Sequence, residues 1–155
     1  MKKAIIVGAS SGIGKGIALS LLRDHYKIGI TGRRIDNLEE IKKINPKNIF
    51  VSSYDCTKES NAKKLGELEK LMGGLDMLVI SSGFGDVNKS LEFSIENKTN
   101  QLNVVAFTET VGWGFNYFSK QNSGHIVAIS SIAGIRGNGL APSYNASKAY
   151  QINYL

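Results

Sequence analysis

The sequence predicts an α/β fold, a doubly wound parallel sheet with helices on both of its faces. Two features of the 155 residues predict it. Five short apolar runs alternate along the chain with segments whose apolar residues recur at helical spacing. The runs are continuously apolar, which is typical of strands buried on both faces. Alternation of strand and helix produces parallel strands joined by right-handed crossovers.

The expected strands cover residues 4–7, 28–31, 49–51, 77–80 and 125–129, and the helices lie near residues 13–22, 36–44, 59–72, 96–120 and 144–155. Several helix ends carry a signal. Asp36 is a suitable N-cap for the second helix, Gly73 a suitable end for the third, and Pro142 can open the last. Gly112 and Gly114 lower the helix propensity of the fourth.

Length and composition exclude several classes of protein. The chain is 42% hydrophobic and 21% charged, which suits one domain, residues 1–155, and excludes a disordered chain. A single cysteine, Cys56, excludes an intramolecular disulfide, and neither it nor the two isolated histidines predict a metal site. No apolar run approaches the roughly 18 residues of a membrane helix, and the first run is too short for a signal peptide. We expect a cytoplasmic protein with no membrane partner.

The charge balance favours an anionic partner of small size. The sequence has 19 Lys and Arg against 13 Asp and Glu, a net charge of +6. These basic residues are spread along the chain, whereas a nucleic-acid interface needs them clustered. We therefore expect no nucleic-acid partner, because a small molecule that carries phosphate satisfies the same charge.

A glycine-rich segment joins the first strand to the first helix. It reads Gly8, Ala9, Ser10, Ser11, Gly12, Ile13 and Gly14. Glycines permit a tight turn and let the backbone approach a pyrophosphate, and the free N–H groups at a helix start favour that anion. Serine hydroxyls add donors. The segment predicts a dinucleotide-phosphate site, and the alternative is a glycine-rich turn that holds no ligand.

The second strand ends in a pair of arginines. Arg33 and Arg34 follow Gly32, with no acidic residue at this point. In a dinucleotide fold an acid here binds a free ribose 2′-hydroxyl, whereas an arginine accommodates a 2′-phosphate. The pair predicts NADP(H) in preference to NAD(H). The alternative is a solvated arginine pair on the surface.

Candidate catalytic groups lie in the last third of the chain. Tyr144 and Lys148 are spaced i and i+4, so they share one helix face about 5–6 Å apart. A nearby ammonium stabilises a tyrosinate and makes the tyrosine hydroxyl a usable acid–base. Ser131 ends the fifth strand, where the ligands of open parallel sheets bind. The alternatives are an exposed helix face and a serine that only hydrogen-bonds its own turn.

Taken together, these motifs resemble the short-chain dehydrogenase/reductase family, of NADP(H) type. The resemblance rests on the glycine spacing, on Ser131, on Tyr144 and Lys148, and on the offset of 13 residues from Ser131 to Tyr144. The order and spacing match over essentially the whole chain. The resemblance implies a Rossmann-like fold and no metal.

The resemblance also implies a role for each residue. Tyr144 would transfer a proton to or from the substrate oxygen, Lys148 would assist it and hold the nicotinamide ribose, and Ser131 would orient the carbonyl. Asn103 would hold a water in a proton relay. The implied cofactor contacts are Gly8, Ser10, Ser11, Gly12, Ile13, Gly14, Arg33, Arg34, Asp55, Cys56, Ser82, Gly83, Tyr144 and Lys148.

The sequence departs from the family pattern in three places. Val7 replaces a threonine, and Ile80 with Ser81 replaces two asparagines, which predicts a repacked apolar contact between these segments. The chain ends inside its last helix without a capping signal, so we expect the family fold to be truncated at the C-terminus. The family pairs subunits through the two helices expected near 96–120 and from 143, which implies a homodimer or homotetramer for a full-length protein.

Two functions follow from the sequence. The first is an NADP(H)-dependent oxidoreductase that interconverts a carbonyl and a secondary alcohol, with residues 85–92 and 135–142 selecting an unidentified small molecule. The second is a non-catalytic dinucleotide-binding sensor or regulator that keeps the fold. A basic nucleic-acid binder is a third reading that rests on charge alone.

Overall fold

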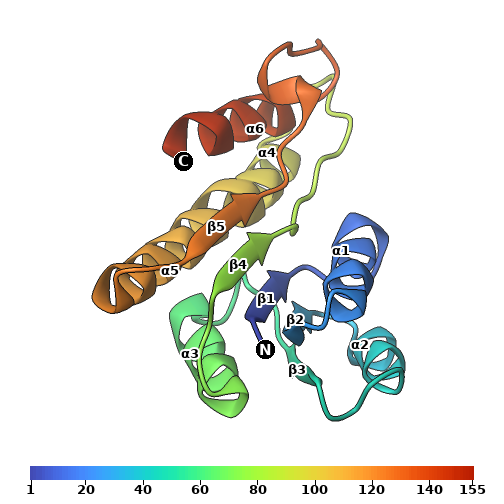
Figure 1. Ribbon diagram of the computed structural model, residues 1–155. Helices are drawn as coiled ribbons and strands as arrows, with labels where there is room; N and C mark the ends of the chain where they lie inside the picture. Colours follow the sequence, from blue (N-terminus) through green and yellow to red (C-terminus); the bar gives the residue numbers. More distant parts are fainter.

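Five parallel strands form one sheet in the order β3-β2-β1-β4-β5 (Figure 1). The computed structural model describes residues 1–155. The strands are β1 (Lys3–Val7), β2 (Lys27–Gly32), β3 (Ile49–Ser53), β4 (Met77–Ile80) and β5 (His125–Ala128). The predicted α/β fold is confirmed, and it is Rossmann-like because strand order reverses at β1, which pairs with both β2 and β4.

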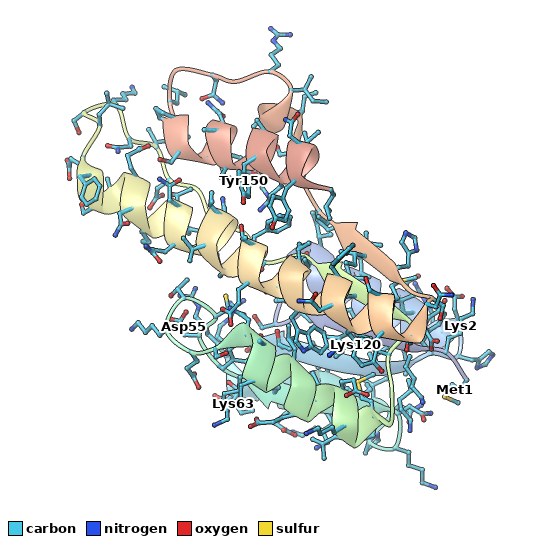
Figure 2. The ribbon with its side chains drawn as sticks, turned by 90° about the vertical axis from the view of Figure 1, so that its left-hand side faces the viewer. Met1, Lys2, Asp55, Lys63, Lys120 and Tyr150 are labelled. Atoms are coloured by element: carbon cyan, nitrogen blue, oxygen red, sulfur yellow. The ribbon has the colours of Figure 1, made fainter.

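Helices cover both faces of the sheet. They are α1 (Gly12–Arg23), α2 (Ile35–Lys42), α3 (Asn61–Met72), α4 (Phe93–Asn100), α5 (Phe107–Gln121) and α6 (Pro142–Tyr154), with a π-helical segment Gln101–Ala106 and a 3-10 turn Ile132–Gly134. Side chains alternate along β1. Ile5 therefore packs with residues of α3 and α5, while Ile6 packs with residues of α1 and α2. Figure 2 shows α3 and α5 side by side on their face of the sheet. No helix is long and apolar enough to cross a membrane.

One helix-end prediction was wrong. The second helix begins at Ile35, so Asp36 lies in its first turn rather than at the N-cap, and there its charge still interacts favourably with the helix dipole. The long helix expected over 96–120 is confirmed as one helical run, but it comprises α4, the π-helical segment and α5 in succession. Its middle is widened where the buried Asn103 turns inward. Periodicity alone does not reveal such a π-bulge.

The other helix-end signals are confirmed. Gly73 ends α3 in the left-handed conformation with φ of 74°, and Pro142 occupies the first turn of α6. Gly114 lies against β4, and a Cβ there would lie 2.5 Å from the Leu78 side chain. Its cost in helix propensity is offset by this close packing of α5 on the sheet.

The predicted apolar contact between the first and fourth strands is also confirmed. Val7 and Ile80 are register partners in β1 and β4. Both side chains are 2% exposed and belong to one apolar cluster. The buried Val7 and Ile80 side chains therefore form an apolar layer beneath the carboxyl ends of these two strands. Ligands of open parallel sheets bind above such a point.

Candidate active site

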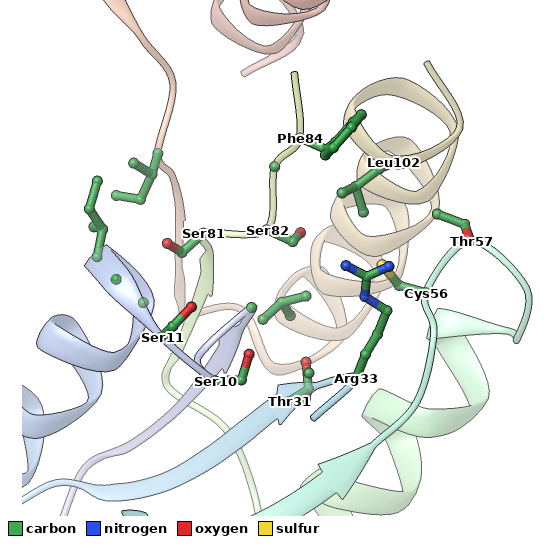
Figure 3. A pocket seen from close by; sticks show the side chains of 18 of the residues that line it. Ser10, Ser11, Thr31, Arg33, Cys56, Thr57, Ser81, Ser82, Phe84 and Leu102 are labelled. Atoms are coloured by element: carbon green, nitrogen blue, oxygen red, sulfur yellow. The ribbon is translucent and has the colours of Figure 1, made fainter. Parts of the chain in front are cut away.

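A cavity of about 610 Å³ opens at the carboxyl ends of the strands. This volume is in the range of small-molecule and cofactor sites. Every residue that the sequence assigns to cofactor binding lines it, from Gly8 to Lys148. The lining also includes residues that the motifs did not indicate, among them Thr31, Tyr54, Phe84, Gly85 and Leu102 (Figure 3). Leu102 precedes Asn103 in the π-helical segment.

The glycine turn is held against the end of β4. Gly8 has a φ of 87°, and a Cβ there would lie 2.6 Å from the backbone nitrogen of Ser82. A Cβ on Gly14 would lie under 3.0 Å from the carbonyl oxygen of Gly8. Both glycines are therefore required by the close approach of backbone to backbone. The turn is made of main chain and cannot accept side chains at these points.

The start of α1 faces the cavity without a side-chain cap. Ser11 is the N-cap residue and its side chain makes no capping hydrogen bond. Four N–H groups at a helix start have no partner within the helix, and they attract anions. A Cβ on Gly12 would meet nothing within 4 Å, so open space lies above the turn. These features fit a pyrophosphate.

The two arginines lie at different places. Arg34 donates from Nη2 to the hydroxyls of Ser10 at 3.0 Å and Ser11 at 2.5 Å, which fastens it to the glycine turn. Arg33 extends over the end of β2 toward Cys56 and the loop after β3 (Figure 3). Arg34 therefore supports the glycine turn, and Arg33 covers the next part of the cavity.

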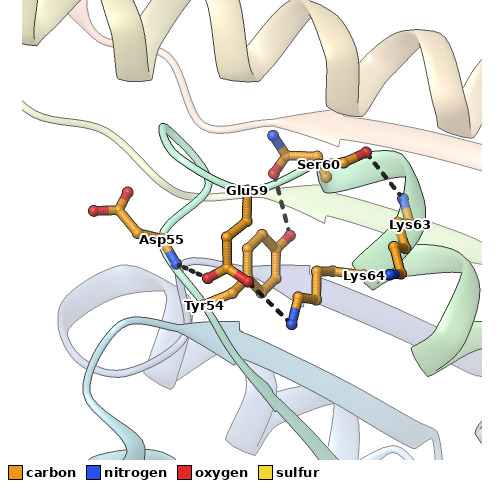
Figure 4. A network of polar contacts seen from close by, with 7 residues as sticks. Tyr54, Asp55, Glu59, Ser60, Lys63 and Lys64 are labelled. Carbon is orange, nitrogen blue, oxygen red and sulfur yellow. Dashed lines mark hydrogen bonds and ion pairs between the residues drawn. The ribbon is translucent and has the colours of Figure 1, made fainter.

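The loop after β3 is ordered by its own polar contacts (Figure 4). Oδ1 of Asp55 accepts from the backbone N–H and the hydroxyl of Thr57, at 3.0 and 2.7 Å. The Tyr54 hydroxyl donates to Asn61 at 3.2 Å, and Glu59 pairs with Lys64 at 3.1 Å. The hydrogen bond from the Thr57 side chain is the main cause that lowers the pKa of Asp55.

Cys56 contributes shape rather than reactivity to this loop. Burial, with the negative charge of Asp55 second, raises the pKa of the Cys56 thiol to about 11. The thiol stays protonated at neutral pH and is a poor nucleophile. No group of three or more His, Cys, Asp or Glu side chains is arranged to hold a metal ion.

Glu109 of α5 anchors the same loop from the other side. Its carboxylate accepts from the Ser60 hydroxyl, the Asn61 amide and the backbone N–H of Ala62, at 3.1, 2.9 and 3.2 Å. Burial raises the pKa of Glu109, but these hydrogen bonds outweigh it and hold the pKa below its usual value. No sequence motif indicated this contact, because its partners are 47–49 residues apart.

Tyr144 and Lys148 of α6 reach the cavity together. The Lys148 nitrogen lies 5.8 Å from the centre of the Tyr144 ring. Gly85 lies against that ring, and a Cβ on Gly85 would be under 3.0 Å from it. Burial lowers the pKa of Lys148, whose nitrogen donates to the carbonyl oxygen of Ile129 at 2.9 Å. The pair is thus fixed between the loop after β4 and the end of β5.

The two remaining predicted catalytic residues do not line the cavity. Ser131 accepts at its hydroxyl from the backbone N–H of Ala133 at 3.2 Å, as an N-cap of the 3-10 turn. Asn103 is fully buried and clasps Phe84, accepting from its N–H at 2.9 Å and donating to its carbonyl at 2.7 Å. Ser130, which the motifs did not single out, is part of the lining.

Comparison with known proteins identifies the family. The profile of the short chain dehydrogenase family matches residues 2–154. The chain belongs to this family. An uncharacterized oxidoreductase of Myxococcus xanthus is 29% identical, over 99% of this chain and 63% of the relative. One of Listeria monocytogenes is 34% identical, over 95% of this chain and 62% of the relative. This short-chain dehydrogenase chain thus spans less than two thirds of the length of these relatives.

Solved structures of nucleotide complexes have the same fold. ElxO with NADP bound is 27% identical, with a TM-score of 0.87 over 99% of this chain and 64% of that one. An alcohol dehydrogenase of Thermococcus sibiricus, complexed with 5-hydroxy-NADP, is 25% identical, with a TM-score of 0.83 over 96% of this chain and 66% of that one. Both are dinucleotide complexes on the scaffold described above.

Proposed function

We propose that the protein is an NADP(H)-dependent oxidoreductase that interconverts a carbonyl and a secondary alcohol. One observation carries the proposal: the glycine turn and the Tyr144–Lys148 pair line a single cavity. A phosphate site and an acid–base pair in one cavity are what hydride transfer on a dinucleotide requires. The oxidoreductase names of the relatives support it.

The glycine turn would hold the pyrophosphate and the loop after β3 the adenine. The N–H groups at the start of α1 face the cavity, and Asp55 and Cys56 border it. When bound, the nicotinamide supplies or accepts a hydride at the substrate carbon. The chain's own contribution is to position both reactants and exclude water from between them.

Tyr144 and Lys148, both on α6, would carry out the acid–base chemistry. In reduction, the Tyr144 hydroxyl donates its proton to the substrate oxygen, and in oxidation the tyrosinate takes it back. The Lys148 ammonium favours the tyrosinate. Ser131 would orient the carbonyl with its O–H, which the hydrogen bond accepted from Ala133 leaves free, and Asn103 would act by fixing the loop that carries Phe84.

The preference for NADP(H) over NAD(H) would come from Arg33 and Arg34. Arg34 is already oriented by Ser10 and Ser11, and Arg33 lies beside it at the end of β2. Arginine suits a phosphate because of its planar fork of donors. The NADP-bound structures of similar proteins support this preference.

A calorimetric titration of the chain with NADPH and, separately, with NADH tests the proposal. We expect saturable binding that favours NADPH and a preference that shrinks at least tenfold in Arg34→Ser and Arg33→Ser variants. Arg136→Ser is a matched control, because Arg136 is outside the cavity lining. Preference for NADH would refute the arginine assignment, and no binding of either would refute the cofactor site.

A non-catalytic dinucleotide sensor is the second candidate. It is favoured by one observation: Ser131 and Asn103 make local hydrogen bonds and do not line the cavity. Under this reading the chain binds the dinucleotide but turns over no carbonyl. NADPH consumption across a panel of aldehydes and ketones would exclude it.

We also propose one cytoplasmic NAD(P)-binding domain over residues 1–155 and self-association through the long helical run. Val105 and Phe115 are 55% and 64% exposed along that run. Large exposed apolar side chains on a helical run are surface that pairing of copies would bury. Sedimentation of wild type against Phe115→Glu tests it, and an unchanged monomer in both would refute it.

A further inference from the structure

A buried glutamine lies behind the catalytic pair. Gln151 is one turn beyond Lys148 on α6 and is 2% exposed. Its Oε1 accepts from the Lys148 nitrogen at 2.9 Å, and its Nε2 donates to the backbone carbonyl of Asn103 at 2.9 Å. Neither the glycine motif nor the Tyr–Lys spacing indicated it. The amide therefore joins α6 to the π-helical segment through the catalytic lysine.

The surroundings of the Lys148 ammonium are otherwise neutral. It donates to the carbonyl of Ile129 and to the amide of Gln151, and the Tyr144 ring and Gly83 are its other neighbours. Burial is the cause of its lowered pKa, and no carboxylate offsets it. An ammonium has three N–H donors, so two are fixed by the protein and one remains for the cavity that Lys148 lines. Gln151 thus determines where that third donor points.

The inner side of the lysine is closed by the same amide. The side chain of Asn103 is already engaged with Phe84 and with the Ser147 hydroxyl at 2.9 Å. Its backbone carbonyl accepts from Gln151, so this oxygen of the residue expected to hold a relay water is also engaged. A primary amide donates and accepts hydrogen bonds but does not gain or lose protons at ordinary pH. The contact therefore holds the lysine without passing a proton inward.

We propose that Gln151 is a positioning residue of the catalytic site: it orients the Lys148 ammonium toward the cavity and closes the site on its inner side. Protons lost or gained by the Tyr144–Lys148 pair then exchange through the cavity mouth. This inference rests on the proposed oxidoreductase function for its catalytic meaning. The geometry between Lys148, Gln151 and Asn103 stands independently of it.

The test compares Gln151→Glu and Gln151→Met with wild type, using the ¹³Cε–¹Hε NMR titration of Lys148, assigned with Lys148→Met. A carboxylate in place of the amide raises the pKa of Lys148 by about one unit or more, because an opposite charge within hydrogen-bond reach favours the ammonium. Methionine removes the acceptor and lowers that pKa further. Both substituted side chains are close to glutamine in size, and either variant alone tests the proposal if the other does not fold.

Gln121→Met is the matched control. Gln121 also donates to two backbone carbonyls, of Leu75 at 2.9 Å and Ser123 at 2.7 Å, at the far end of α5. We expect it to lower the melting temperature without moving the Lys148 titration. A purely structural Gln151 would behave like this control. Equal Lys148 titrations in wild type and both Gln151 variants would overturn the proposal.

The pH dependence of NADPH-linked carbonyl reduction gives the catalytic readout. In Gln151→Glu the high-pH midpoint of kcat moves upward by about one unit, because the added carboxylate cancels the positive potential at Tyr144. An unmoved midpoint would contradict the catalytic role. If wild type reduces no carbonyl, the proposed function fails, while the Lys148 titration still decides whether Gln151 positions the lysine.

Discussion

The two ends of the cavity are built in different ways. One end, the proposed phosphate end, is made of main chain: Gly8 and Gly14 bring β1 and α1 so close to neighbouring backbone that no side chain fits. The other end, where we propose the acid–base chemistry, carries Tyr144 and Lys148 in its wall. Behind that wall the buried Gln151 amide accepts from Lys148 and donates to the backbone carbonyl of Asn103. The first end is rigid because backbone contacts leave no space. The second depends on each amide and ammonium having its partner, so it is the more sensitive to single polar substitutions.

The largest effect is expected at the phosphate end. Gly14→Ala forces a Cβ against the carbonyl of Gly8, so it should destabilise the protein by about 3 kcal/mol and abolish NADPH binding. Gly16→Ala, two residues later in α1, meets nothing within 4 Å and should stabilise the helix by up to about 1 kcal/mol. Urea unfolding and calorimetry check both. Equal behaviour of the two variants would refute the backbone account of this end.

The next effect separates chemistry from binding. Tyr144→Phe should lower kcat by about 10²–10⁴-fold and leave NADPH affinity within about twofold, because only the proton donor is removed. Tyr150→Phe is the control on the same helix, since its hydroxyl bonds Thr108 at 2.7 Å outside the cavity. It should cost about 1 kcal/mol of stability and leave kcat intact. Full activity of Tyr144→Phe would remove tyrosine from the mechanism.

A smaller effect is expected where Gly85, in the loop after β4, contacts the Tyr144 ring. A Cβ on Gly85 would push the Tyr144 ring out of place, so Gly85→Ala should lower kcat about tenfold or more while NADPH still binds. A Cβ on Gly83 would lie 3.3 Å from the Lys148 nitrogen, which needs a much smaller shift, so Gly83→Ala should be milder. Steady-state rates with saturating NADPH measure the difference. A milder loss in Gly85→Ala than in Gly83→Ala would contradict this geometry.

The smallest effect is the pH dependence contributed by Glu109. Its pKa is lowered in the folded state, so its stabilisation is fully present above the unfolded pKa and is lost as pH falls through the folded pKa. Because Glu109 is exposed, the contribution is a fraction of a kcal/mol. The unfolding free energy at about pH 6 exceeds that at about pH 3 partly because of this carboxylate, so Glu109→Gln should make the difference between the two values smaller. An unchanged gap would show that this carboxylate does not stabilise the loop.

The same contrast explains which features the sequence could predict. Apolar runs predicted the five strands and the glycine spacing predicted the tight turn after β1, because both follow from local pattern and steric need. The N-cap expected at Asp36 is Arg34, two residues earlier, since several residues near a helix start can serve as the cap. The sequence did not predict the π-helical segment or the contacts of Gln151 and Glu109. The hydrogen bonds that Asn103, Gln151 and Glu109 make join residues 44 to 49 positions apart in the sequence. Long-range polar contacts carry no periodic signal.

One measurement tests most directly whether the two ends form a single site. NADPH is titrated into the chain while the ¹³Cε–¹Hε signal of Lys148 is followed by NMR. The account predicts a saturable shift of that signal, with the same dissociation constant as calorimetry, and no shift in Gly14→Ala. Binding of NADPH that leaves the Lys148 signal unmoved would contradict it, because the phosphate turn and the catalytic pair would then not share one ligand.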